Sequence, residues 1–116
     1  LDIVITQTLD VCISNAAVSR YVLTNNTSTT VYYQVEYFIQ GSSGYVVADT
    51  DLTLGAAGSS TQSSEFTQSV ASGKFIRWRY KAATSLSGLV SATYVDHVQS
   101  ATVNATLPPR LCPQRT

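Results

Sequence analysis

Apolar and polar side chains alternate with a period of two along most of the chain, and this feature constrains the fold more than any other. Successive side chains of a β-strand point to opposite faces of its sheet, whereas an amphipathic helix repeats about every 3.6 residues. The alternation therefore predicts strands that bury one face. No segment shows the helical period, so we expect seven or eight strands and no helix. The expected strands cover residues 1–13, 18–24, 30–40, 45–54, 61–70, 74–82, 89–96 and 98–107.

The loops between these strands are short and polar, which is typical of hairpin connections. Strands that follow one another through short loops pair antiparallel by default. A chain of 116 residues has the length of one domain, and strands with two different faces favour two stacked sheets. We therefore expect a single all-β domain over residues 1–116, folded as an antiparallel two-sheet sandwich.

Residues 21–33 read YVLTNNTSTTVYY, a polar turn between two strands of which the second alternates aromatic residues with valine. This stretch, and the strand spacing over most of the chain, resemble the immunoglobulin-like and fibronectin-III-like modules of microbial surface proteins. The Cys…Trp…Cys framework of antibody domains is missing, because both cysteines lie outside the central strands. The resemblance implies an immunoglobulin-like sandwich, a fold used for adhesion, spacing, carbohydrate binding and fibre building.

Cys12 and Cys112 are the two cysteines of the chain and lie near its opposite ends. Their separation excludes a C-x-x-C redox or zinc motif. It favours one disulfide that closes almost the whole chain in an oxidising compartment, with two free buried thiols as the alternative. The chain begins with Leu1 and carries no leader-like segment, so we interpret it as a mature chain after removal of a signal peptide.

Charge and glycosylation signals also favour an extracellular or cell-surface location. Seven basic residues balance seven acidic ones, so no basic excess is present to bind the phosphates of nucleic acids. No apolar run approaches the roughly 18–20 residues of a membrane span. Candidate N-glycan acceptors in Asn-x-Ser/Thr sequons are Asn25, Asn26 and Asn104.

The N-terminal segment 1–13 is longer than an ordinary strand and presents a row of apolar side chains on one edge. It has two interpretations. It is either a strand of its own sheet, or a strand that completes the sheet of a neighbouring copy and so builds a filament. Gln7 interrupts the row, which argues against a uniform donor strand. The residues of the proposed assembly strand are Leu1, Ile3, Ile5, Leu9, Val11 and Ile13.

The segment 74–82 concentrates charge on one face and large apolar groups on the other. Its Trp78 face is expected in the core. The opposite face suggests a contact with an anion, a sugar acid or an acidic partner strand, and the alternative is cross-strand pairing with carboxylates of the same domain. Outward-facing aromatic residues on the strand 30–40 add to this surface. The candidate binding surface comprises Tyr32, Phe38, Phe75, Arg77, Arg79 and Lys81.

No catalytic signature is recognisable. His97 follows Asp96, but adjacent strand residues point to opposite faces, so this aspartate is poorly placed to orient the imidazole. Asp49 and Asp51 are two positions apart on one strand, which suggests either a weak cation site or a solvated strand face. We expect no cofactor, no metal and no enzymatic activity.

These observations lead to two functional hypotheses. The first is a non-catalytic extracellular structural protein, a subunit that self-associates into a surface fibre, pilus or layer through contacts between strand edges. The alternative is a secreted carbohydrate-binding or adhesion module that uses the candidate binding surface.

Overall fold

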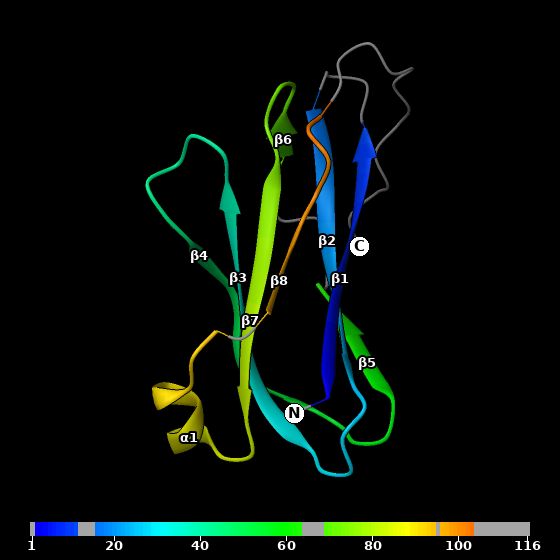
Figure 1. The fold of residues 1–116 in the computed structure, drawn as a ribbon, viewed down its shortest axis with the longest axis vertical. Helices are drawn as coiled ribbons and strands as arrows, with labels where there is room; N and C mark the ends of the chain where they lie inside the picture. Colours follow the sequence, from blue (N-terminus) through cyan, green and yellow to red (C-terminus); the bar gives the residue numbers. More distant parts are fainter. Residues whose placement is uncertain (1, 12–15, 64–68, 95, 104–116) are drawn as a thin grey trace.

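The computed structural model describes residues 2–11, 16–63, 69–94 and 96–103. Within these residues, eight strands form two antiparallel four-stranded sheets (Figure 1). The first sheet has the order β1-β2-β5, with β6 also paired to β2, and the second has the order β4-β3-β7-β8. The expected antiparallel two-sheet sandwich is confirmed. The strands are β1 (Ile3–Val11), β2 (Ala16–Asn25), β3 (Val31–Ile39), β4 (Val46–Leu54), β5 (Ser59–Gln62), β6 (Ser69–Ala71), β7 (Ile76–Ala83) and β8 (Asp96–Gln99).

The N-terminal segment lies in the sheet of its own chain. β1 pairs with β2 in an unbroken antiparallel register from Ile3–Asn25 to Val11–Ala17. Ile3 and Ile5 are buried in the core between the sheets, and Leu9 packs against that core. The structure therefore agrees with the first of the two interpretations, in which the N-terminal segment is a strand of its own sheet. A strand donated by a neighbouring copy is not needed to complete this sheet. Leu1 and Ile13 lie outside the described residues.

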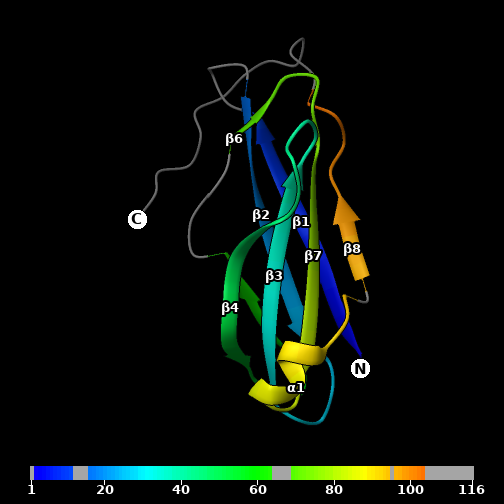
Figure 2. The same cartoon turned by 90° about the vertical axis from the view of Figure 1, so that its left-hand side faces the viewer.

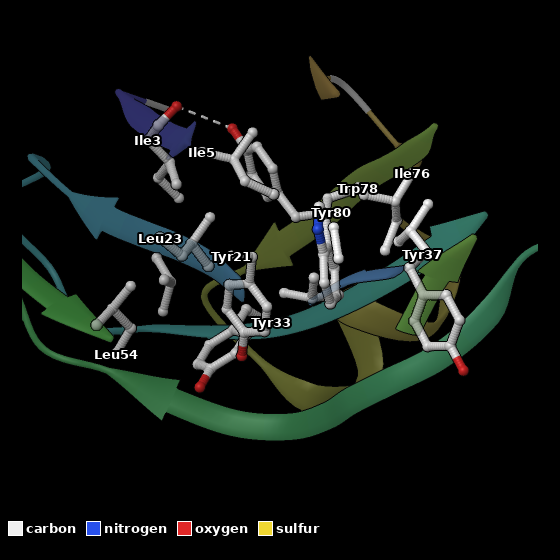
Figure 3. Close-up of a cluster of buried hydrophobic side chains, with 14 of the residues drawn as sticks. Ile3, Ile5, Tyr21, Leu23, Tyr33, Tyr37, Leu54, Ile76, Trp78 and Tyr80 are labelled. Carbon is white, nitrogen blue, oxygen red and sulfur yellow. Dashed lines mark hydrogen bonds between the residues drawn. The ribbon is translucent and has the colours of Figure 1, made fainter. Parts of the chain in front are cut away.

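Three buried aromatic side chains connect the two sheets through hydrogen bonds, and Figure 3 shows all three rings in the core with the bond between Tyr80 and Ile3. The fully buried Trp78 of β7 donates its indole N–H to Ser19 Oγ of β2 at 2.9 Å, which confirms its expected place in the core. Tyr80 donates its hydroxyl to the Ile3 carbonyl at 3.0 Å, and Tyr21 donates its hydroxyl to Asp49 at 2.6 Å. Burial and the hydrogen bond to Asp49 raise the pKa of Tyr21 well above its usual range, so its hydroxyl stays a donor.

A buried polar chain explains why Gln7 interrupts the apolar row of β1. Ser19 Oγ, which accepts from the Trp78 indole, donates in turn to Gln7 Oε1 at 3.1 Å. A leucine or isoleucine at position 7 would leave this buried hydroxyl without an acceptor, and unsatisfied buried polar groups are costly. The glutamine is therefore part of the link between the sheets.

The expectation of a chain without helices is wrong at residues 86–91. The first residues of the segment 89–96, expected as a strand, belong instead to the short helix α1 (Leu86–Ser91), residues 92–94 are irregular, and Asp96 begins β8. Ser85 caps the helix, because its Oγ accepts from the Gly88 N–H at 3.0 Å. Leu89 is the residue that α1 buries, and Val90 is 81% exposed. A helix of fewer than two turns shows no period in the sequence, which is why the alternation was misleading here.

Two other expected strands are shorter than the sequence suggests. In place of a strand over 61–70 the structure has β5 and β6, which pair with opposite ends of β2, and residues 64–68 lie outside the described part. β8 begins at Asp96 and ends at Gln99, whereas the sequence predicts a strand over 98–107. Residues 104–107 lie outside the described part.

Asn25 is a structural residue and not an accessible glycan acceptor. Its side chain is fully buried at the end of β2. Its Nδ2 lies within hydrogen-bonding distance of the carbonyls of Thr29, Leu54 and Gly55, and its Oδ1 accepts from the Thr27 N–H. The amide thus ties the turn between β2 and β3 to the end of β4. In the folded chain the amide nitrogen of Asn25 is engaged and enclosed, which disfavours a glycan there, and the glycan at Asn25 stays a prediction.

The other covalent modifications remain predictions. Asn26 is exposed and keeps its sequon. Asn104 and both cysteines, Cys12 and Cys112, lie outside the described residues, so the expected disulfide stays a prediction.

The structural role of Asn25 predicts a large difference between two neighbouring alanine substitutions. Asn25→Ala leaves buried carbonyls without donors and should lower the free energy of unfolding by about 2–3 kcal/mol. The matched control Asn26→Ala removes an exposed side chain and should change it by less than about 0.5 kcal/mol. Urea denaturation followed by tryptophan fluorescence measures both. Equal stability of the two variants would contradict the buried role of Asn25.

Candidate binding surface

The register between β3 and β7 gathers the predicted binding residues on the outer face of the second sheet. Inward-facing pairs such as Tyr37–Trp78 alternate with outward-facing pairs such as Phe38–Arg77 and Glu36–Arg79. Figure 2 shows this sheet in front of the first, with α1 at one end of β3 and β7. We call the outward-facing bases and rings on this sheet and its flanking loops the cation–aromatic face. Its members are Tyr32, Phe38, Tyr45, Phe75, Arg77, Arg79, Lys81 and Tyr94.

Arg79 is enclosed by two rings and a carboxylate. Its guanidinium carbon lies 3.6 Å from the centre of the Tyr45 ring and 3.9 Å from the centre of the Tyr94 ring. Its Nε and Nη2 both donate to Glu36 Oε1, at 3.0 and 2.7 Å. This ion pair is the cross-strand pairing that the sequence left open as the structural alternative. Through these ring contacts, Arg79 connects the outer face of the sheet to Tyr45, just before β4, and to Tyr94, in the segment after α1.

Glu36 is the acceptor at the centre of this arrangement. Its Oε2 accepts from Gln34 Nε2 at 3.1 Å, and Gln34 also donates to the Tyr94 hydroxyl at 2.8 Å. Burial acts to raise the pKa of Glu36, but hydrogen bonds from Tyr94 and Arg79 outweigh it and lower the pKa below its ordinary value. Burial and the neighbouring Glu36 carboxylate raise the pKa of Tyr94. The carboxylate is thus ionised and fully engaged.

Arg77 and Lys81 differ from Arg79, because neither pairs with a carboxylate among the described residues. Arg77 donates through Nε and Nη2 to Gln99 Oε1, at 3.0 and 2.6 Å, which leaves its charge uncompensated. Its guanidinium carbon lies 5.5 Å from the centre of the Phe75 ring and 5.9 Å from that of the Phe38 ring. The Lys81 ammonium lies 5.4 Å from the centre of the Tyr94 ring. The exposed Asp51 carboxylate accepts from Thr50, which also donates to Gln34 beside this face, but no ion pair joins Asp51 to Arg77 or Lys81 in the described part of the chain.

Tyr45 and Tyr94 were not among the predicted site residues. Tyr45 is the first residue of the expected strand 45–54 and lies just before β4, and Tyr94 falls in the expected strand 89–96 but follows α1 in the structure. Tyr32, which was predicted, is half-buried at the end of β3. Helix α1 packs closely against this end of β7. Even a Cβ added to Gly88 would lie only 3.3 Å from the Cβ of Ala83, the residue of β7 that pairs with Tyr32. The helix therefore covers this end of the face, and the Phe38 end is the more open one.

The structure gives Asp49 and Asp51, the pair considered as either a weak cation site or a solvated strand face, different surroundings. The Asp49 carboxylate accepts from the buried Tyr21 hydroxyl, whereas Asp51 is exposed and has a φ of 59°. The pairing of β3 with β4 shifts register on both sides of Val35, so the alternation that would place both carboxylates on one face is broken. No cluster of three or more His, Cys, Asp or Glu side chains occurs in the part of the chain that the structure describes. No helix there is long and apolar enough to cross a membrane.

The lowered pKa of Glu36 predicts a specific dependence of stability on pH. A carboxyl with a lowered folded-state pKa stabilises the fold above its ordinary pKa of 4.5, and this contribution is lost as the pH falls through the folded-state value. The wild type should therefore lose more unfolding free energy than Glu36→Gln between about pH 6 and about pH 2.5. Urea denaturation at a series of pH values tests this difference. Parallel pH profiles of the two proteins would show that Glu36 carries no such linkage.

Comparisons with known proteins place the chain in no family. No family model matches it, and neither a curated protein nor a solved structure does. The likeness to immunoglobulin-like and fibronectin-III-like modules therefore stays a prediction, and the functional argument depends on the geometry described above.

Proposed function

We propose that this chain is a non-catalytic extracellular module that binds a carbohydrate or another surface polymer through the cation–aromatic face. The observation that carries the proposal is Arg77, a partly exposed arginine that pairs with no carboxylate among the residues that the structure describes, set beside the Phe38 and Phe75 rings. A sugar presents both hydroxyl groups and apolar C–H faces. Rings supply apolar contact area, and guanidinium and amide groups supply hydrogen bonds, so this combination suits such a ligand.

The rigidity of the surrounding side chains supports a binding role. Arg79 is held between Tyr45 and Tyr94 and by Glu36, and Thr50 donates to Gln34 Oε1 at 2.7 Å. Side chains that are already ordered lose little conformational entropy when a ligand binds. The fixed Arg79 cluster therefore serves as the base of the surface, and Arg77, Phe38 and Lys81 remain to contact the ligand.

Assembly through strand edges is the second candidate. β4 is an edge strand of nine residues, and Val46, Val47 and Leu52 on it are each about half exposed, at 48%, 48% and 45%. Exposed apolar edge strands invite pairing with another chain. Two features of β4 oppose such pairing, namely its shifted register against β3 and the acidic residue at position 51. Donation of β1 to a neighbour would withdraw Ile3 and Ile5 from the core, so the β4 edge is the better candidate for assembly.

The binding proposal predicts a loss of glycan retention in one alanine variant. Phe38→Ala removes a ring that contacts Arg77, Tyr45 and Phe75, and should reduce retention on a glycan array by about tenfold, a difference of about 1.4 kcal/mol. The control Val4→Ala removes an exposed apolar side chain from the first sheet and should leave retention unchanged. If the wild type binds no glycan on the array, or both variants bind equally, the proposal fails.

Sedimentation separates the binding module from the assembly subunit. Under the binding proposal the unreduced wild type should sediment as a monomer. Assembly through β4 predicts oligomers that Val47→Lys disperses, because a charge on an edge strand blocks pairing. Val4→Lys places the same charge on β1, the free edge of the first sheet, and leaves such oligomers intact. Oligomers that resist Val47→Lys and disperse with Val4→Lys would instead implicate β1.

A further inference from the structure

We infer that the ligand of the cation–aromatic face is an anionic polysaccharide, one whose sugars carry carboxylate or sulfate groups. This inference rests on the proposed binding function and adds the chemical class of the ligand. Its basis is the unequal state of the three bases on β7. Arg79 is neutralised by Glu36, whereas Arg77 and Lys81 have no carboxylate partner in the described part of the chain.

The spacing of the two available charges indicates an extended ligand. Arg77 and Lys81 lie four positions apart on one strand face, which corresponds to about 13 Å at about 3.3 Å per residue. A single small anion cannot contact both, whereas a polymer lying along β7 can. Between them lies the Arg79 cluster, whose Tyr45 and Tyr94 rings offer apolar area to the uncharged parts of the polymer. The alternation of charge, ring and charge is the feature that an acidic polysaccharide complements.

The small number of available charges argues against a nucleic acid. Proteins that bind nucleic acid tightly make about 6–10 phosphate contacts and carry a basic excess. This chain has a net charge of zero, and its cation–aromatic face has two bases that form no ion pair with any described residue. Two charges with flanking rings fit a polymer in which charges are separated by uncharged, ring-sized units. An acidic polysaccharide meets this description, and a polyphosphate backbone does not.

The neighbouring side chains are also compatible with anion binding. Gln99 already orients the Arg77 guanidinium, and the Phe75 ring lies beneath it. The Glu36 carboxylate has both oxygens engaged, by Arg79 and by Gln34, and the exposed Asp51 carboxylate accepts from Thr50. An incoming anion therefore meets positive charge without displacing an existing ion pair.

The test titrates four probes into the unreduced full chain by calorimetry: polygalacturonate, dextran sulfate, neutral dextran and a single-stranded DNA oligonucleotide. We expect binding to polygalacturonate or dextran sulfate, and which of the two binds distinguishes a carboxylate from a sulfate ligand. Affinity should fall by about tenfold when the salt concentration rises from about 20 to about 200 mM, because the contact involves few charges. Binding to neutral dextran and to DNA should be weaker than to the anionic polysaccharides.

Matched variants assign the binding to the two bases. R77Q/K81Q should lower the affinity for the anionic probe by at least about tenfold. T6E/Q62E lowers the net charge equally but on exposed positions of the first sheet, and should retain the wild-type affinity. Arg77→Lys keeps the charge and should lie between the wild type and the double variant. Circular dichroism of each variant verifies that the fold is intact.

Three results would overturn the inference. They are equal anion binding by wild type and R77Q/K81Q, stronger binding to DNA than to the polysaccharides, and equal binding to neutral and anionic dextrans. If neutral and anionic dextrans bind equally, the proposed function still survives, provided that Phe38→Ala lowers retention on the glycan array as expected. A chain that binds none of the glycans on the array loses the proposed function as well, so the two failures are distinguishable.

Discussion

The burial of Trp78 and Tyr80 in β7 is the constraint on which the rest of the structure depends. Both rings lie between the sheets and donate to atoms of the first sheet, Trp78 to Ser19 and Tyr80 to the Ile3 carbonyl. These bonds fix the position of β7 against β1 and β2. Because side chains alternate along a strand, the same placement directs Arg77, Arg79 and Lys81 outward, and a shift of one residue would bury three charges. The composition of the outer surface therefore follows from the packing of the core.

Once the bases of β7 face outward, their surroundings decide what each can do. Arg79 lies opposite Glu36 and is stacked between Tyr45 and Tyr94, so its interactions are used within the fold. Arg77 lies opposite Phe38 and donates to a neutral amide, and Lys81 contacts a ring. Cation–ring contacts of this kind stabilise by about 0.5–1 kcal/mol at exposed positions, without neutralising the charge. The result is a surface in which one base supports the structure and two remain available to a ligand.

The sequence predicts the strands and the outward row well, because both follow from alternation over at least seven residues. The inward face of β3 and the outward row of bases on β7 are examples. It does not predict α1, which is too short for a period, or the division of 61–70 into β5 and β6. Tyr45 and Tyr94 contact Arg79 across large separations in sequence, and local alternation does not predict which strands or loops come together. The buried state of Asn25 was equally hidden, because its partners Leu54 and Gly55 lie far along the chain.

The central claim is that Arg77 is available to a ligand while Arg79 is held by the fold. The most direct measurement is an NMR titration that follows the Nε–Hε signals of the arginine side chains as polygalacturonate is added. We expect the Arg79 signal to be protected from exchange with water and to stay in place, because its Nε–H donates to Glu36. The Arg77 signal should shift, together with amide signals of β7 and β8. Ligand-induced shifts confined to β1 and β2, or an Arg79 signal that shifts as much as that of Arg77, would contradict the account.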